Sequence, residues 1–142
     1  LKDAETAAVF KNEKRINKVF NLYQIIDIAF LGIGTATESH PLIAGHLKEK
    51  ELGVFKALNL AGSINSIFFD QEGKIAELPF NNRIVAVAKE ELLNINFRIG
   101  IAVGSAKEQA VLAALKSSLI NILITDLSMA EFLQNQKGCN NV

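Results

Sequence analysis

Residues 99–126 contain the glycine turn and the polar side chains that are best placed for binding chemistry. The string IGIAVGSAKEQAVLAALKSSLINILITD predicts a strand, a tight Gly-Ser turn at Gly104-Ser105, a helix of small residues and a second buried strand that ends at Thr125-Asp126. A helix that begins just after the carboxyl end of a strand presents backbone N–H groups where open α/β sheets bind ligands. The pattern therefore favours an anionic ligand at this turn.

Lys107 is the unusual residue of this segment. A cation in the first turn of a helix is disfavoured by the helix dipole, by roughly 0.3–1 kcal/mol. A bound anion would reverse that cost, whereas the alternative reading is a solvated lysine that needs no ligand. Asp126 has two readings as well: it presents a polar group to a ligand, or it caps the helix that follows.

Two further segments could contact a ligand. Gly32-Ile33-Gly34-Thr35 follows an apolar run, and bare glycines let a ligand approach the backbone closely, although glycine pairs are common at strand ends. The segment lacks the third glycine of the dinucleotide fingerprint, and the chain has no G-K-[ST] of a Walker A loop. Asp70, in the turn DQEG, either forms that turn or accepts hydrogen bonds from sugar hydroxyls.

The remaining reactive residues favour neither catalysis nor metal binding. His40 and His46 are six positions apart with no third ligand at a matching spacing, so we expect no metal site and no cofactor. No Ser-His-Asp, Cys-His or G-x-S-x-G pattern is present. The single cysteine, Cys139, excludes an internal disulfide and is typical of a reducing cytosol.

Composition bounds the class of protein. The chain has 142 residues, of which 49% are hydrophobic and 21% charged, as expected for one globular domain. Its 15 basic and 15 acidic residues give a net charge of +0, which argues against a strongly basic nucleic-acid surface. No apolar run approaches the ~20 residues of a membrane span, and no signal-peptide pattern begins the chain. We therefore expect a cytoplasmic protein without membrane contact.

Strand and helix signals alternate along the chain, which predicts an α/β fold with a mainly parallel sheet and helices on its faces. Two S-x-x-E strings, Ser105 with Glu108 and Ser128 with Glu131, predict capping boxes at helix starts. The expected helices cover 1–20 with a break near Lys11–Glu13, 48–58, 89–93, the segment after Ser105, and 128–136; the other expected strands cover 26–34, 64–69 and 84–88.

Several strings together resemble the sugar-binding effector domain of SorC/DeoR-type bacterial transcription regulators. They are DIAFLGIGTA (27–36), FFDQEG (68–73), RIVAVAKEEL (83–92), the segment 99–126 and ITDLSMAEFL (124–133). The strings occur in the family's order and at about its spacing. Each string alone is weak evidence for the resemblance, and together the strings are specific for this family.

The resemblance implies a Rossmann-like three-layer sandwich, similar to sugar-phosphate isomerases and CoA transferases, that binds a phosphorylated sugar or related metabolite. It implies that Gly32, Gly34 and Thr35 line the pocket floor, with Glu38 and Ser39 in the adjoining loop. It further implies that Asp70 reaches ligand hydroxyls and that Lys107, with the Gly104-Ser105 turn and Asp126 nearby, holds a phosphate. Ligand binding in such regulators alters a homo-oligomer, a dimer or tetramer, and so the DNA affinity of an N-terminal helix-turn-helix.

The chain departs from the family pattern at three places. Ser105 stands where the family has a second glycine, Leu127 where it has an acidic residue, and Gly62-Ser63 where it has Gly-Asp. Residues 1–142 further resemble an effector domain without the helix-turn-helix and without its first βα units. Two alternatives stay open: a sugar-phosphate isomerase that uses Asp70 or Asp126 as its base, and an oligomerisation module with a vestigial pocket.

Overall fold

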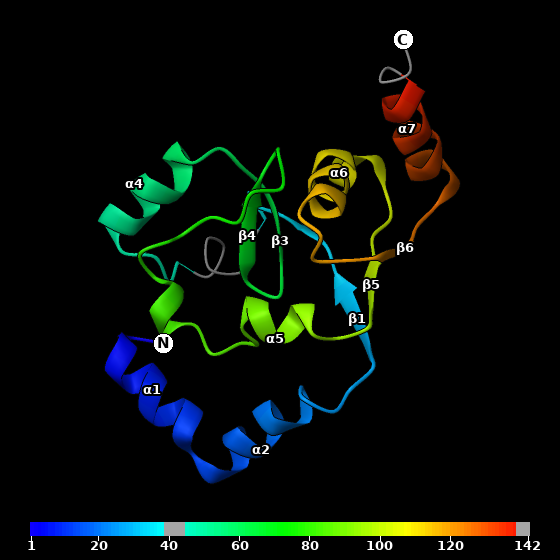
Figure 1. Ribbon diagram of the computed structural model, residues 1–142. Helices are drawn as coiled ribbons and strands as arrows, with labels where there is room; N and C mark the ends of the chain where they lie inside the picture. Colours follow the sequence, from blue (N-terminus) through cyan, green and yellow to red (C-terminus); the bar gives the residue numbers. More distant parts are fainter. Residues whose placement is uncertain (39–44, 139–142) are drawn as a thin grey trace.

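The computed structural model describes residues 1–38 and 45–138 (Figure 1). Helices and strands are interspersed along the chain, and they alternate from α5 to α7 as the sequence predicts. In chain order the elements are α1 (Ala4–Asn12), α2 (Lys14–Leu22), β1 (Ile28–Gly32), β2 (Gly34–Thr35), α4 (Glu49–Ala57), β3 (Leu60–Ile64), β4 (Ile67–Asp70), the 3-10 turn η1 (Asn81–Arg83), α5 (Lys89–Leu93), β5 (Phe97–Ile101), the 3-10 turn η2 (Ser105–Lys107), α6 (Glu108–Lys116), β6 (Ile122–Ile124) and α7 (Leu127–Gly138).

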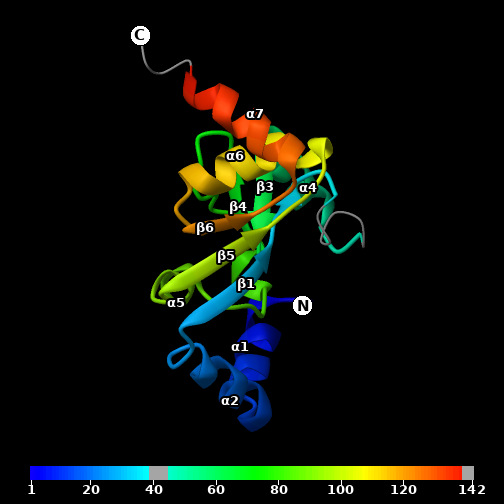
Figure 2. The same cartoon turned by 90° about the vertical axis from the view of Figure 1, so that its right-hand side faces the viewer.

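A parallel sheet forms one part of the molecule, with the strand order β1-β5-β6. Its strands come from apolar, β-branched runs, which is typical of strands that lie inside an α/β fold. Seen from the side, the strands cross the middle of the molecule, with α6 and α7 at one end (Figure 2). The expectation of a parallel sheet is thus confirmed for one of two sheets.

The second sheet is antiparallel, with the order β2-β3-β4, so the fold is a mixed α/β fold rather than a mainly parallel one. The predicted strand 64–69 is confirmed over 67–69, within β4, and is wrong as a single continuous strand. The chain reverses at Asn65 and Ser66, which have φ of 52° and 64°, and β3 and β4 form a hairpin around them. Two successive residues with positive φ match the twist of paired strands. Asn-Ser is a weaker turn signal than Asn-Gly, which is why the sequence did not reveal the reversal.

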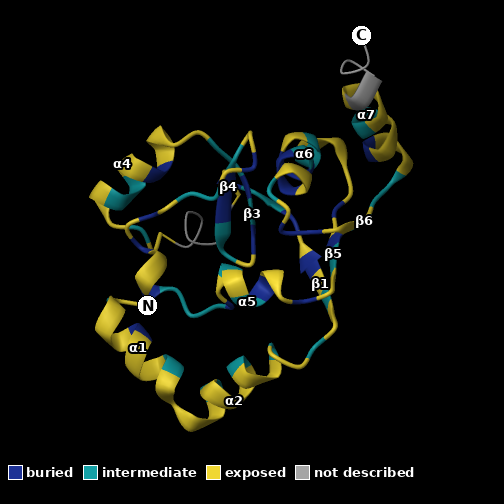
Figure 3. Cartoon of the chain, viewed as in Figure 1, coloured by how far each residue is buried: buried dark blue, intermediate teal, exposed yellow. Residues whose placement is uncertain are grey.

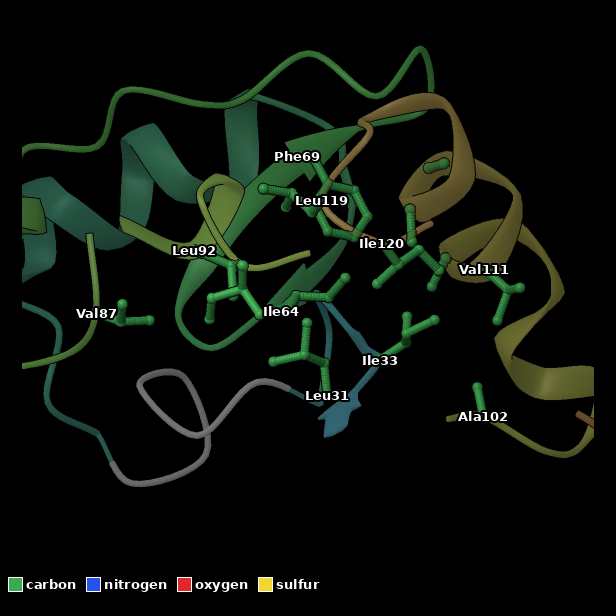
Figure 4. Close-up of a cluster of buried hydrophobic side chains, with 14 of the residues drawn as sticks. Leu31, Ile33, Ile64, Phe69, Val87, Leu92, Ala102, Val111, Leu119 and Ile120 are labelled. Carbon is green, nitrogen blue, oxygen red and sulfur yellow. The ribbon is translucent and has the colours of Figure 1, made fainter. Parts of the chain in front are cut away.

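The larger hydrophobic core lies between the two sheets and α6 (Figure 4). Small residues on α6 allow this close packing, because Ala110, Ala113 and Ala114 are all buried. A Cβ at Gly62 of β3 would lie 2.9 Å from the Ala110 Cβ, so α6 packs directly on the backbone of β3. The fully buried Phe69 and Met129 complete the core from β4 and α7.

A smaller aromatic core lies beneath α4. The Phe55 and Phe68 rings meet edge to face with centroids 5.2 Å apart, and Phe80 lies 6.2 Å from each. Beside it, the buried Arg83 forms an ion pair with Glu51 of α4. The predicted strand 84–88 is wrong, since this segment has no strand partner among the described residues and packs as an irregular connection to α5.

Most helix predictions are confirmed. The predicted break falls at Glu13, whose carboxylate accepts hydrogen bonds from the Arg15 and Ile16 amides and so caps α2. The helices predicted at 48–58 and 89–93 correspond to α4 and α5. None of the described helices is long and apolar enough to cross a membrane.

Candidate functional site

The carboxyl ends of the three parallel strands meet at one edge of the sheet. Gly32 of β1 pairs with Ile101 of β5, which pairs with Ile124 of β6. The Thr125 hydroxyl then donates a 2.7 Å hydrogen bond to the Ala102 carbonyl, which fixes the loops that follow β5 and β6 side by side. This is the edge at which open α/β sheets bind ligands.

Asp126 ties these two loops together. Its Oδ2 accepts a hydrogen bond from the Gly104 amide at 2.7 Å, and its Oδ1 accepts one from the Met129 amide at 2.9 Å. The hydrogen bonds from Met129 and Gly104 hold the pKa of the Asp126 carboxyl below its ordinary value. The capping alternative for Asp126 is therefore confirmed, and Asp126, not Ser128, caps α7.

The Gly104 turn differs from the prediction in two ways. The Gly104 amide is not bare, because Asp126 occupies it, and Ser105 makes no side-chain cap: it begins the 3-10 turn η2, and α6 begins at Glu108. Gly104 itself has φ of 90°, and a Cβ placed there would have no heavy atom within 4 Å. The turn needs glycine for its backbone conformation and faces open space.

Lys107 stands at the end of this turn. Its amide donates to the Gly104 carbonyl at 3.1 Å, and the residue is half-buried at the start of α6. Among the described residues, no group accepts a hydrogen bond from its ammonium group or pairs with it. Lys107 therefore lies beside the turn, as predicted, and its charge is not used by the fold.

Gly32, the last residue of β1, lies at the same edge, and Gly34 begins β2 just beyond it. A Cβ at Gly32 would meet no atom within 4 Å, so this backbone is open as well. Gly34 and Thr35 pair with Ser63 and Gly62 of β3, and Gly62 packs on Ala110 in the first turn of α6. The Thr35 hydroxyl donates to Glu38 Oε2 at 3.4 Å, and Ser39 lies outside the described residues.

Asp70 lies elsewhere. Its Oδ1 accepts hydrogen bonds from the Glu72 and Lys74 amides, both at 2.9 Å, which is the turn-forming alternative. Gly73 of the same turn packs on Ser117, just past the end of α6. Lys107 directly precedes the opposite end of this nine-residue helix, about 13 Å away at 1.5 Å per residue. The structure thus brings Gly104, Ser105, Lys107 and Asp126 together, places Gly32 at the same edge of the sheet, and leaves Asp70 apart.

Three cavities among the described residues do not include the Gly104 turn. The most spacious, about 710 Å³, lies between the chain start, the segment 45–48 and the segment 83–85. A cavity of about 400 Å³ is lined by Asp70, Lys74 and Glu77. The predicted site at the Gly104 turn therefore lies outside these three cavities.

Arg98, which the sequence interpretation passed over, joins several loops through hydrogen bonds. Arg98 donates to the carbonyl groups of Leu119, Ile95, Leu93 and Ser118, at 2.6–3.4 Å. It thereby joins the loops that precede β5 and β6. A charged residue inside the otherwise apolar run 97–103 was the available signal. No group of three His, Cys, Asp or Glu side chains able to hold a metal ion occurs in the described part of the chain.

The chain matches known proteins over most of its length. Residues 1–135 match a family described as "Putative sugar-binding domain". Transcriptional regulator LsrR of Enterobacter sp. (strain 638) is 30% identical over 131 residues, which make up 89% of this chain and 41% of the relative. LsrR of Escherichia coli (strain K12) is 29% identical over 131 residues, which again make up 89% of this chain and 41% of the relative.

Solved structures agree with this result. The full-length sorbitol operon regulator SorC of Klebsiella pneumoniae superposes with a TM-score of 0.82 and 25% identity, covering 94% of this chain and 43% of SorC. A DeoR family transcriptional regulator from Listeria monocytogenes superposes with a TM-score of 0.80 and 28% identity, covering 94% of this chain and 54% of the regulator. The chain thus spans about half the length of these relatives, which are transcriptional regulators, not enzymes. It belongs to the family of sugar-binding domains found in SorC- and DeoR-type transcriptional regulators.

Proposed function

We propose that this chain is the effector-sensing part of a bacterial transcriptional regulator and that it binds a phosphorylated sugar or related metabolite. The observation that carries the proposal is the open Gly104 turn, flanked by a lysine ammonium group with no described partner and by an ionised aspartate. Family membership supports sugar as the ligand class.

The two charged groups suggest how a sugar phosphate would lie. Lys107 supplies a charge-assisted contact to a phosphate, worth roughly 1.5–3 kcal/mol. The Gly104 amide is already bonded to Asp126, so the phosphate would lie on the Lys107 side of the turn. The Asp126 oxygens retain lone pairs that can accept sugar hydroxyls. Gly32, Gly34 and Thr35, with Glu38 and Ser39 beyond them, would line the floor.

Asp70 enters this proposal with a weaker role. Its Oδ1 is committed to its own turn, and that turn packs beside the far end of α6 from Lys107. A ligand long enough to reach both Lys107 and Asp70 would have to extend across Gly62 and the start of β3.

Sensing requires that the ligand prefer one arrangement of the regulator. In the proposed setting, a sugar phosphate biases a dimer or tetramer in the cytoplasm and so changes the DNA affinity of a separate N-terminal domain. The isomerase alternative receives no support from the relatives, all of which are named as regulators.

The experiment is a calorimetric titration of the protein with hexose and pentose phosphates, each beside its unphosphorylated sugar and beside inorganic phosphate. We expect at least one sugar phosphate to bind at least tenfold more tightly than both controls, and the Lys107→Ala variant to lose most of that difference. Equal affinity for phosphorylated and unphosphorylated sugars throughout the panel would contradict the proposal.

A further inference from the structure

The cavity of about 710 Å³ takes no part in the proposed sugar-phosphate site. Its volume lies within the roughly 300–1,000 Å³ that is usual for small-molecule pockets. The chain start, the segment 45–48, Ser66 of the β3–β4 hairpin and the segment 83–85 line it, and neither Gly104 nor Lys107 does. In Figure 3 the exposed beginnings of α1 and α4 flank η1, the turn from which the segment 83–85 starts.

The buried Arg83 joins the walls of this cavity. Its guanidinium donates to two carbonyl oxygens, that of Leu1 at 2.9 Å and that of His46 at 3.1 Å, and it forms the ion pair with Glu51 of α4. Its Nε is also buried and has no hydrogen-bond partner among the described residues. A buried donor without a partner is rare in native proteins and calls for an explanation, such as a bound molecule.

Two lysines of the lining carry charges that the fold does not use. Neither the Lys2 nor the Lys48 ammonium group forms an ion pair within the described part of the chain. Hydrogen bonding at the start of α1, and then the charges of Lys2 and Lys48, hold the pKa of the Asp3 carboxyl below its ordinary value, so both lysines lie near that carboxyl. Asp3 and Glu51 offset two of the three positive charges of Lys2, Lys48 and Arg83. The cavity therefore has a surplus of one positive charge.

Much of the remaining lining is apolar. It includes Leu47, Phe80, Ile84 and Val85, and no acidic side chain belongs to the lining. Phe80 is also part of the smaller aromatic core beneath α4, which holds its ring in place. A molecule that fills this cavity must therefore combine a negative charge with an apolar body.

We propose that this cavity is a second ligand site, which binds a small organic carboxylate with an aromatic or branched apolar body. The carboxylate accepts charge-assisted hydrogen bonds from Lys2 and Lys48, and the apolar body lies against Phe80, Ile84 and Val85. One negative charge matches the surplus of one positive charge, whereas a phosphate monoester would bring more. A sugar phosphate fits poorly for another reason, because its hydroxyl groups would face apolar side chains without hydrogen-bond partners.

The test is a calorimetric titration of the 142-residue chain with indole-3-acetate and 4-methylpentanoate, each beside its neutral amide and beside acetate. We expect at least one of the two carboxylates to bind at least tenfold more tightly than its amide, which lacks the charge, and than acetate, which lacks the apolar body. In NMR spectra the amides of Gly45, Ile84 and Val85 should shift on binding, and those of Gly104 and Lys107 should not. Lys107→Ala should leave this binding unchanged, so a failure of the sugar-phosphate proposal is distinct from a failure here.

Lys48→Met removes one ammonium group and keeps an unbranched apolar side chain, so we expect it to weaken carboxylate binding at least fivefold. Lys50→Met is the matched control, because Lys50 is exposed on the same helix and does not line the cavity. Equal losses in the two variants, equal affinity for each carboxylate and its amide, or no binding of either carboxylate would overturn the proposal. Shifts at Gly104 and Lys107 instead of Gly45 and Val85 would assign the carboxylate to the glycine turn and overturn it too.

Discussion

Two glycine turns near opposite ends of α6 share a backbone geometry and differ in packing. Each has a glycine with positive φ, Gly73 at 78° and Gly104 at 90°, and each has an aspartate that accepts two backbone amides. Gly73 is packed, since a Cβ there would lie 2.5 Å from the Ser117 nitrogen, whereas Gly104 faces open space. The packed turn is structural, and the open one has room for a ligand.

The largest expected effect comes from filling the packed turn. Gly73→Ala would combine a left-handed backbone, which costs about 1–2 kcal/mol, with overpacking that costs about 1–3 kcal/mol. Gly104→Ala would carry only the backbone cost of about 1–2 kcal/mol. Urea unfolding of both variants checks this, and equal losses would remove the distinction between the turns.

The two aspartates should differ in the range of their effects. Asp126→Ala removes the contact between the β5 and β6 loops and the cap of α7, so we expect a lower melting temperature together with faster exchange at Gly104 and Met129. Asp70→Ala should accelerate exchange only at Glu72 and Lys74. Amide exchange measured by NMR separates the two patterns. Faster exchange of the Gly104 amide in the Asp70→Ala variant would contradict the prediction, because it would show that the two turns are coupled.

Acid should weaken the open turn through Asp126. Its pKa is lowered by folding from an ordinary value of 3.8, so its contribution to stability is present above pH 3.8 and is lost as pH falls below that value through the folded pKa. The difference in melting temperature between wild type and Asp126→Ala should be constant above about pH 5 and shrink below 3.8. A constant difference down to pH 2 would show that the carboxylate charge is not involved.

The smallest effect on stability is expected at Lys107. Removing a cation from the start of α6 should leave stability unchanged or raise it by about 0.3–1 kcal/mol. Lys116→Ala is the control at the other end of the helix, where the ammonium group donates to the Gln71 carbonyl at 3.0 Å and to Glu72 Oε2 at 3.1 Å. Thermal unfolding compares them, and a marked loss in Lys107→Ala would give that lysine a structural role.

The sequence predicted the elements that depend on local patterns, such as α4, α5 and the helix break at Glu13, because capping and apolar spacing are encoded locally. It predicted the Gly104 turn and the position of Lys107 for the same reason. It missed the Asn65-Ser66 reversal, whose residues lack a strong turn signal. It also missed that Asp126 occupies the Gly104 amide, a contact between residues 22 apart that only the sheet brings together.

The central claim is that the open turn, and not the packed one, receives an anionic sugar. The most direct measurement is an NMR titration with the sugar phosphate that binds most tightly in calorimetry, following the amides of Gly104, Lys107 and Gly73. We predict saturable shifts at Gly104 and Lys107 with none at Gly73, and their loss in Lys107→Ala. Shifts confined to Gly73 and its neighbours, or none at Gly104, would contradict the account.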